Sequence, residues 1–372
     1  MTTTPSAALV QLETVQGLRN DIADLFQVFD TTLDEPERGF VRFRGRFLHD
    51  PAYCFDDLRE RYERHGFTPQ IKAQDDLIAL IGMPIVFQPQ ESKRTINLLL
   101  FVATILSTLF VGASYVAEST EELFMIWRGW PFSLSIMLIL GAHEMGHYFA
   151  ARYHNVPVTL PYFIPMPVPG SFGTFGAFIQ LKAPVKNKRA LLDVGAAGPW
   201  AGLLFAIPIL FLGLATSEVL PLPVATAYQM EGNSILYAAM KLIVFGRFLP
   251  AGGMDVHLNQ VAWAGWVGLL VTSLNLIPLG QLDGGHVAYV LLGEWAKLLF
   301  WPIIIALGLL VILTGTLTWI LWIALLFFLG RRYAVPLDEV TPLDPRRRII
   351  AILTLALFFL VFIPIPIQIV IP

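Results

Sequence analysis

The chain has 372 residues, of which 55% are hydrophobic and 14% are charged, and its formal net charge is −3. With a mean hydropathy of +0.64, it is more apolar than soluble domains usually are, so most of the chain is expected to lie in lipid. A slightly acidic chain with no basic block gives no reason to expect nucleic acid as a partner. Cys54 is the one cysteine. It lies in a charged helical stretch and is expected to pack as a small residue.

The apolar residues are unevenly distributed, which indicates two kinds of domain. Charged side chains are frequent up to residue 94, whereas apolar runs and short loops follow from Thr95. The expected organisation is a flexible lead-in at 1–35, a small soluble α+β accessory domain at 36–92 and a membrane-embedded domain at 93–372. The N-terminus lacks the basic-then-apolar order of a secretory signal, so the first apolar span is expected to remain as an anchor.

The soluble domain has the pattern of a β-α-β-β module. Val41–Phe47 alternates apolar and basic residues, as a strand does, and Phe67–Ala73 and Leu77–Val86 resemble two further strands. Pro51–His65 has helical spacing, with Pro near its start and Gly66 after its end. Because no clustered Cys and His or glycine-rich phosphate loop is present, an accessory or regulatory role is favoured over a second active site.

The rest of the chain is predicted to be a polytopic all-α membrane protein. A helix needs roughly twenty apolar residues to cross the hydrocarbon core. Segments of that kind give about six or seven transmembrane helices, near 96–117, 132–153, 191–215, 261–278, 295–313, 317–330 and 349–371. The sixth is short and is either a partial span or a continuation of the fifth.

The basic residues predict an orientation, because Lys and Arg are enriched on the cytoplasmic side of membranes. If the spans alternate, one side collects most of them: Lys93, Arg94, Lys182, Lys186, Lys188, Arg189, Arg331, Arg332 and Arg346–Arg348. The N-terminal domain is therefore expected in the cytoplasm. In the absence of an obvious transit peptide, a prokaryotic cell membrane is the expected location.

The second apolar span contains the sequence HEMGH. His143 and His147 are four residues apart and share one face of a helix, and Glu144 lies between them. This spacing lets both imidazoles bind one zinc ion while the glutamate reaches a metal-bound water. Polar residues in membrane helices also serve as interhelical hydrogen-bonding groups. Three ionisable side chains so close together at membrane depth instead favour a functional site.

A catalytic zinc site usually takes three protein ligands. In the fourth apolar span, NLIPLGQLDGGH at 275–286 interrupts a hydrophobic stretch with helix-breaking residues. Such breaks occur at membrane depth where the backbone is buried in protein or lines a wet cavity. Asp283 is the expected third ligand, since its flanking glycines allow close approach. His286 is a rival for the same role.

These residues predict one Zn²⁺ per chain and hydrolysis by a zinc-activated water, with Glu144 as general base and acid. Two neutral imidazoles and one carboxylate leave one positive charge on the site, which ionised Glu144 neutralises. Asn275 is expected either to hold the substrate or oxyanion by its amide or to satisfy loosened backbone.

The pairing of HEMGH at 143–147 with NLIPLGQLDGGH at 275–286 resembles the site-2 protease family of intramembrane zinc metalloproteases, which is peptidase M50-like. The likeness continues in GSFGTFGAFIQLKAP at 170–184, GAAGPWAG at 195–202 and PLDEVTPLDPRRR at 336–348. It covers roughly residues 95–350 and is most similar to the branch of chloroplast proteases required for ethylene-dependent greening and their prokaryotic relatives. The resemblance implies a substrate that is itself a membrane-spanning segment.

Under this interpretation, the glycine-rich stretch Gly170–Lys182 has a function, because a helical substrate must unwind before hydrolysis. It is expected to form a membrane-associated hairpin whose edge pairs with the extended substrate. The residues assigned to substrate binding are Gly173, Thr174, Phe175 and Gly176. A re-entrant loop that only covers the site is the alternative.

Other classes of function are less consistent with the sequence. A membrane metal-ion transporter using the same ligands needs no glutamate between the histidines and commonly has inverted repeats, which are not found here. A haem or di-iron oxidoreductase requires further histidines on facing helices, and only His286 is available. Intact Glu144 and both histidines count against an inactive scaffold. The expected partners are a transmembrane protein substrate and the lipid bilayer.

Overall fold

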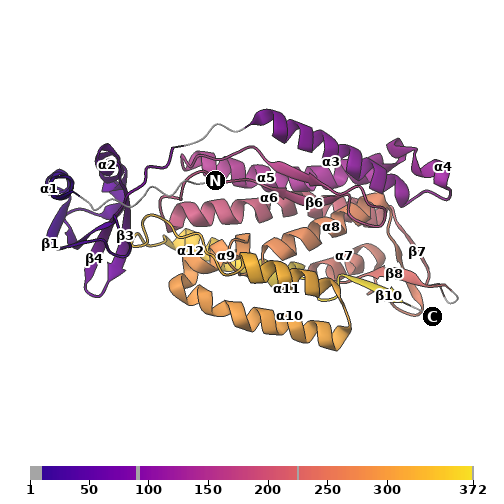
Figure 1. Ribbon diagram of the computed structural model, residues 1–372. Helices are drawn as coiled ribbons and strands as arrows, with labels where there is room; N and C mark the ends of the chain where they lie inside the picture. Colours follow the sequence, from indigo (N-terminus) through magenta and orange to yellow (C-terminus); the bar gives the residue numbers. More distant parts are fainter. Residues whose placement is uncertain (1–10, 89–92, 224–225, 371–372) are drawn as a thin grey trace. The chain divides into compact units, whose positions relative to one another are not determined.

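The computed structural model describes residues 11–88, 93–223 and 226–370. These residues form two compact units (Figure 1). The N-terminal unit combines Met1–Gln90 with two later segments, Lys182–Leu191 and Val335–Asp344. The membrane unit comprises the remainder, namely Glu91–Leu181, Leu192–Ala334 and Pro345–Pro372.

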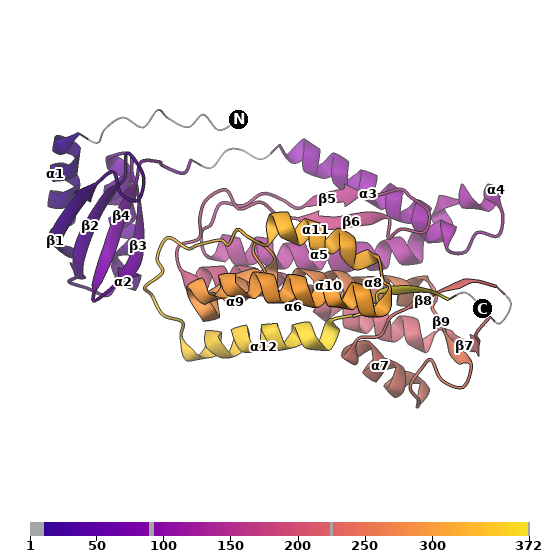
Figure 2. The same ribbon diagram turned by 60° about the horizontal axis from the view of Figure 1, so that its bottom comes forward.

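The N-terminal unit is an α+β structure. Its elements are α1 (Leu12–Asp21), β1 (Phe26–Leu33), β2 (Val41–Phe47), α2 (Pro51–Arg64), β3 (Thr68–Gln74) and β4 (Leu77–Met83). The four strands lie side by side in the order β1-β2-β4-β3, with every neighbouring pair antiparallel (Figure 2). β1 and β3 are therefore the two edges of the sheet.

Alternation along the strands and helical spacing along α1 and α2 produce one hydrophobic core. It includes fully buried Leu18 of α1, Leu58 of α2 and Phe43 of β2. Asp50 caps the start of α2, because its side chain accepts a hydrogen bond from the backbone N–H of Ala52. Cys54 is buried in this core, as expected, and burial raises the pKa of its thiol.

The predicted domain boundary at residue 35 is wrong. Residues Leu12–Asp21 and Phe26–Leu33 form a helix and a strand that belong to the unit, so a flexible lead-in does not extend to 35. β1 carries Asp30, Thr31 and Thr32 and has no clear apolar alternation, but it pairs with β2 along its length. Tertiary pairing therefore overrides a weak local pattern. Residues 1–10 lie outside the described residues.

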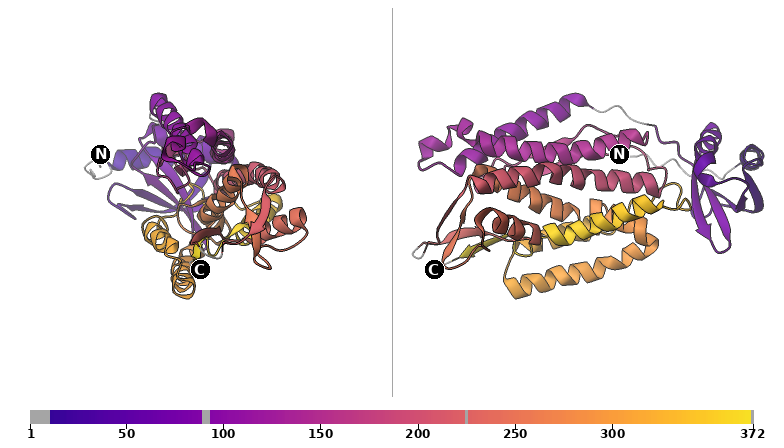
Figure 3. Two further views of the ribbon diagram at one scale, coloured as in Figure 1. Left: turned by 90° about the vertical axis from the view of Figure 1, so that its right-hand side faces the viewer. Right: turned by 180° about the vertical axis from the view of Figure 1, so that it is seen from behind.

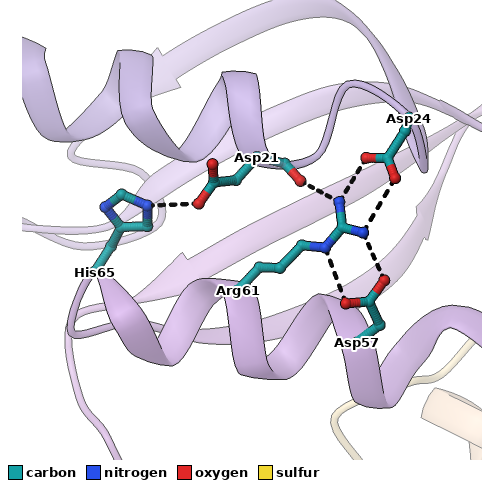
Figure 4. Close-up of polar contacts among 5 residues, drawn as sticks. All are labelled: Asp21, Asp24, Asp57, Arg61 and His65. Carbon is teal, nitrogen blue, oxygen red and sulfur yellow. Dashed lines mark hydrogen bonds and ion pairs between the residues drawn. The ribbon is translucent and has the colours of Figure 1, made fainter.

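One ionic cluster joins α1 to α2 (Figure 4). The guanidinium of Arg61 donates to the backbone carbonyl of Asp21 at 2.5 Å, and it pairs with the carboxylates of Asp24 and Asp57 at 2.5 and 2.7 Å. His65 lies 2.9 Å from the Asp21 carboxylate. The bond from Arg61 lowers the pKa of Asp24, and the two carboxylates raise the pKa of Arg61. A planar guanidinium thus fixes the turn between α1 and β1 to α2.

Replacing Arg61 by alanine is expected to destabilise the N-terminal unit, because the α1–β1 turn loses its donor. Because the pKa of Asp24 is lowered on folding, its contribution is present above the unfolded pKa and is lost as the pH falls. The difference from the parent should therefore shrink in acid. Hydrogen exchange of α1 and α2 measures the effect.

Arg64→Ala is the matched control, since Arg64 pairs with Glu60, whose side chain is 72% exposed. Equal protection of α1 in the parent and in Arg61→Ala would contradict the assignment of this cluster as a stabilising contact.

The membrane unit is mainly helical, with its long helices side by side (Figure 3). Its helices are α3 (Arg94–Ser114), α4 (Thr120–Leu123), η1 (Ile126–Gly129), α5 (Trp130–Tyr153), α6 (Lys188–Ala215, which starts in the segment 182–191), α7 (Ile235–Phe245), α8 (Gln260–Asn275), α9 (Asp283–Leu292), η2 (Gly293–Leu299), α10 (Phe300–Thr314), α11 (Thr318–Leu329) and α12 (Pro345–Val361). Its strands are β5 (Tyr162–Pro165), β6 (Thr174–Phe178), β7 (Glu218–Pro221), β8 (Tyr228–Glu231), β9 (Met254–His257) and β10 (Ile367–Val370).

Three helical segments among the described residues are long and apolar enough to cross a membrane: Arg94–Ser114, Lys188–Ala215 and Asp283–Thr314. Ile235–Phe245 and Thr318–Leu329 are shorter apolar helices. The protein is thus a membrane protein, but the structure does not confirm a count of six or seven spans.

The seventh predicted span, 349–371, is partly wrong. The helix α12 ends at Val361, and β10 then pairs with β8 in an antiparallel ribbon. Pro364 and Pro366 lie between them and lack the N–H that a continuing helix needs. The region near 216–257, where the sequence predicted no element, contains β7, β8, α7 and β9. In it, β7 pairs with β9, and β8 pairs with β10.

The predicted hairpin is present, but its first strand lies upstream of Gly170. β6 pairs antiparallel with β5, which is in the proline-rich segment before the glycines. Gly173, directly before β6, has a φ of 72°, a conformation that favours glycine, and a Cβ there would lie 2.8 Å from the Cα of Thr108. The hydroxyl of Ser107 donates to the carbonyl of Gly173 at 2.6 Å, which holds the hairpin against α3.

Candidate metal centre

The two histidines of HEMGH lie on one face of α5, one turn apart. His143 and His147 are only 3% and 6% exposed, and Glu144 between them is 4% exposed. Pro131 occupies the first turn of α5, where its missing N–H is not needed. One carboxylate and two imidazoles therefore lie buried in an apolar helix bundle. Burial of such groups is favourable only where they are paired or bind a metal.

Asp283 is the first residue of α9, directly after a tight turn. A Cβ at Gly284 would lie 2.0 Å from the carbonyl of Leu276, and one at Gly285 would lie 2.4 Å from the carbonyl of Gly280. Only glycine permits this close backbone approach. The turn between α8 and α9 thereby brings the Asp283 carboxylate to the histidines of α5.

The three side chains converge on one point. Nε2 of His143 and Nε2 of His147 are 3.2 Å apart. Oδ2 of Asp283 is 3.2 Å from the first nitrogen and 3.3 Å from the second. Ligand atoms at about 2.0–2.1 Å from a tetrahedral zinc ion lie roughly 3.3–3.5 Å apart. Three donor atoms at these separations would form one face of a zinc tetrahedron, so these residues fit zinc.

His286 lies one turn after Asp283 and lines the same cavity, but it is not part of the three-residue donor cluster. The geometry therefore favours Asp283 over its rival as the third ligand. The Cβ of His286 lies 3.0 Å from the position of a Cβ on Gly195, which shows how closely α6 and α9 pack here.

A line of glycines on α6 makes room for the histidines. A Cβ at Gly198 would lie 2.0 Å from Nε2 of His147, and one at Gly202 would lie 3.1 Å from Nδ1 of His143. Gly146 has the same role on α5, because a Cβ there would lie 2.5 Å from the backbone carbonyl of Ala197 on α6. The small residues of GAAGPWAG at 195–202 therefore let two helix backbones approach each other at the metal site.

The imidazoles also have neighbours that orient them. Nδ1 of His147 lies 2.7 Å from the backbone carbonyl of Val194, which requires a protonated Nδ1 and leaves Nε2 free to bind metal. Nδ2 of Asn275, at the end of α8, lies 3.3 Å from Nε2 of His143. The Asn275 amide is thus at the site, where it can contact a bound substrate.

A cavity of about 220 Å³ opens on these groups. Its lining combines all the predicted chemical residues with parts of β6, α6 and the turn before α9: His143, Glu144, His147, Ala177, Phe178, Ile179, Leu181, Val194, Gly195, Asn275, Gln281, Leu282, Asp283 and His286. The carboxylate of Glu144 and the three donors therefore line one cavity.

The residues expected to bind substrate, Gly173, Thr174, Phe175 and Gly176, lie in or directly before β6. None of the four lines the cavity, whereas Ala177, Phe178, Ile179 and Leu181 do. The register of the hairpin is set by the pairing of Tyr162 with Phe178. Glycine content marked the hairpin in the sequence, but it did not show which end of β6 reaches the metal site.

Sequence reasoning missed the contribution of α6. Val194, Gly195 and Gly198 all face the site, although none carries a metal ligand or a titratable side chain. The spacing of small residues in GAAGPWAG was the available signal, and it becomes interpretable only when the partner helix is known.

Gly198→Ala is expected to weaken zinc binding at least about tenfold, because the added methyl group occupies the position of a ligand imidazole. Zinc retained by the purified protein during chelator competition measures this. Gly308→Ala is the matched control, since a Cβ at Gly308 meets no atom within 4 Å. Unchanged zinc retention in Gly198→Ala would contradict the close α5–α6 approach.

Comparisons with known proteins agree with this geometry. Residues 131–314 match the model of Peptidase family M50. The chain is 30% identical to a protein of Arabidopsis thaliana named "Probable zinc metalloprotease EGY2, chloroplastic", over 95% of this chain and 65% of that relative. A protein with the same name from Oryza sativa subsp. indica is 29% identical over 92% of this chain and 64% of its own length. The chain thus spans slightly less than two thirds of the length of these relatives. No solved structure matches.

The expected prokaryotic cell membrane conflicts with these relatives, which are named as chloroplastic proteins of plants. That expectation rested on the composition of the N-terminus alone. The membrane setting itself is retained, because it follows from the apolar helices.

Proposed function

Residues 131–314 form a Peptidase family M50 domain, and on this premise we propose that the protein is an intramembrane zinc endopeptidase. The reaction is hydrolysis of a peptide bond within or near the transmembrane segment of a membrane-protein substrate. The observation that carries the proposal is the buried triangle of His143, His147 and Asp283 donor atoms, 3.2–3.3 Å apart, beside Glu144.

His143, His147 and Asp283 would hold the metal. When bound, zinc polarises a carbonyl oxygen and lowers the pKa of water, which makes water a nucleophile at neutral pH. The carboxylate of Glu144 takes the proton of the attacking water and later delivers it to the nitrogen of the leaving amine. Burial at 4% exposure keeps this carboxylate away from competing solvent.

Charge balance supports the same roles. A divalent ion with two neutral imidazoles and one carboxylate keeps one positive charge, which the Glu144 carboxylate offsets inside the bundle. The carbonyl of Val194 fixes the neutral His147 tautomer that this balance needs. Nδ2 of Asn275 would hold the substrate carbonyl as its oxygen gains negative charge.

The substrate is proposed to bind as an extended strand. Ala177, Phe178 and Ile179, at the end of β6, line the cavity next to the donor cluster. β6 pairs with β5 along one edge. Its other edge is proposed to accept the substrate as an added strand. A transmembrane helix unwound along β6 exposes its peptide bonds to Glu144.

A membrane metal-ion transporter with the same ligands is not favoured. A transported ion needs no general base, whereas Glu144 is held in the same cavity as the three donors. The relatives that match most of the chain are named as metalloproteases.

The proposed partners are a transmembrane protein substrate and the surrounding bilayer. The N-terminal unit is proposed to lie on the cytoplasmic face, or on the equivalent face of an organelle membrane. Lys93 and Arg94, which precede α3, and Arg346–Arg348, which begin α12, support this side by their charge.

Glu144→Gln is expected to retain zinc and to lose cleavage by at least about 100-fold, because it removes the general base but no ligand. The test uses the purified full chain in detergent, a panel of single-span membrane peptides and zinc analysis of each preparation. His147→Ala is the comparison variant and should lose both zinc and cleavage. Absence of zinc from well-folded parent protein would sink the proposal, as would cleavage that survives in Glu144→Gln.

Replacing single backbone N–H groups of a cleaved peptide by N-methyl groups should reduce cleavage at alternate positions. Only every second N–H of a strand points toward β6. Mass spectrometry of the products gives the pattern. A reduction that falls equally on neighbouring positions would contradict strand pairing.

A further inference from the structure

The sheet of the N-terminal unit is extended by a segment from far along the chain. The backbone N–H of Ile71, on the edge strand β3, donates to the carbonyl of Leu337 at 2.7 Å. The N–H of Glu339 donates back to the carbonyl of Ile71 at 3.0 Å. Residues around 337–339 thus lie parallel to β3 as an added strand.

A second segment continues the same pattern. The N–H of Leu337 donates to the carbonyl of Val185 at 3.0 Å, and the N–H of Asp338 donates to the carbonyl of Lys186 at 2.8 Å. Residues 182–191 and 335–344, called here the docked segments, therefore both belong to the N-terminal unit.

Side chains hold the docked segments firmly. Leu337 is 2% exposed and packs in the core of the N-terminal unit. Asp338 is fully buried and accepts from the backbone N–H groups of Val340 and Thr341 at 2.9 and 3.0 Å. Lys186 pairs with Asp56 at 2.7 Å. The motif PLDEV at 336–340 is thus a docking sequence and contributes no group to the metal cavity.

The first docked segment leads directly into α6. The side chain of Asn187 accepts from the N–H of Ala190 at 3.0 Å, so it caps the helix that starts at Lys188. Val194 follows within two turns on the same helix. Its carbonyl is the partner of His147 Nδ1 at 2.7 Å.

The second docked segment leads directly into α12, which begins at Pro345. The guanidinium of Arg347, in the first turn of α12, donates to both oxygens of Asp193 on α6, at 2.6–3.1 Å. His154, at the end of α5, lies 2.8 Å from the same carboxylate. His154 thus joins α5 to α6 and α12 through Asp193.

We infer that Asp193, with Arg347 and His154, is a positioning residue for the metal centre, and that the N-terminal unit sets this position through the docked segments. Asp193 precedes Val194 directly. Holding Asp193 against α5 and α12 therefore holds the Val194 carbonyl against His147, which fixes the ring orientation that metal binding requires. The inference rests on the proposed metal centre.

The contact between Asp193 and Arg347 is strong because of its bidentate geometry more than because of surface charge. Asp193 is 22% exposed and Arg347 is 29% exposed, and their contact uses two nitrogens of one planar group. Loss of an outer partner of a metal-ligating histidine typically costs about 10–100-fold in metal affinity. The docked segments lead into α6 and α12, which carry Asp193 and Arg347. Loosening the docked segments is therefore expected to weaken the contact between Asp193 and Arg347.

The first test is Asp193→Asn in the full chain, purified in detergent. Zinc loss to a chelator should accelerate roughly tenfold, and the visible spectrum of the cobalt-loaded protein should change. Asp193→Glu should restore part of the effect. A lower melting temperature with an unaltered cobalt spectrum would show a merely structural role and overturn the inference.

The second test compares two equal truncations in one core. Leu337→Ala removes a docked side chain, whereas Leu58→Ala removes a fully buried leucine of α2 that lies outside the docked segments. Leu337→Ala should accelerate zinc loss several-fold and increase hydrogen exchange at 188–194 of the metal-free protein. Leu58→Ala should do neither. Equal effects of both variants, or no effect of Leu337→Ala, would overturn the role of the docked segments.

These readouts are independent of proteolysis. A zinc-loaded parent that cleaves no peptide would count against the proposed function alone, because zinc retention, the cobalt spectrum and hydrogen exchange of the variants would still decide the inference.

Discussion

The close approach of α6 to α5 is the constraint on which the rest of the site depends. Gly198 and Gly202 leave the space that the imidazoles of His147 and His143 occupy, and Gly146 accepts the backbone of α6 in return. Without that approach, the Val194 carbonyl would not reach His147, and the ring would be free to rotate. The close contact between α5 and α6 at these glycines therefore fixes the orientation of the His147 ring.

A membrane interior makes such rigidity more consequential. Each buried ionisable group is costly unless another group offsets its charge, and Asp283, Glu144 and the two imidazoles form a set that a divalent ion completes. The glycine-rich turn before α9 adds the third donor from a different helix. The site is thus assembled from elements distant in sequence, each held by backbone contacts that tolerate no added side-chain atoms.

Backbone contacts between distant segments also shape the N-terminal unit. Its edge strand β3 would otherwise present unpaired N–H and C=O groups, which proteins usually cover. Here the chain covers that edge with its own segments, through Ile71, Leu337 and Val185. Those segments lead into α6 and α12, which contact each other through Asp193 and Arg347. The proposed role of the N-terminal unit is therefore to set the position of these two helices.

The sequence by itself indicated the chemistry of the candidate site: i, i+4 spacing placed His143 and His147 on one face, and helix-breaking residues pointed to Asp283 as the third donor, with His286 as its rival. It also located most of the helices, because apolar length and local spacing are properties of single segments. Tertiary structure alone decided which end of β6 reaches the cavity, that β1 joins the sheet, that residues 335–344 pair with β3, and that residues 182–191 pair with 335–344. Those features depend on pairing between segments far apart in the chain, whose register and closeness no local pattern encodes.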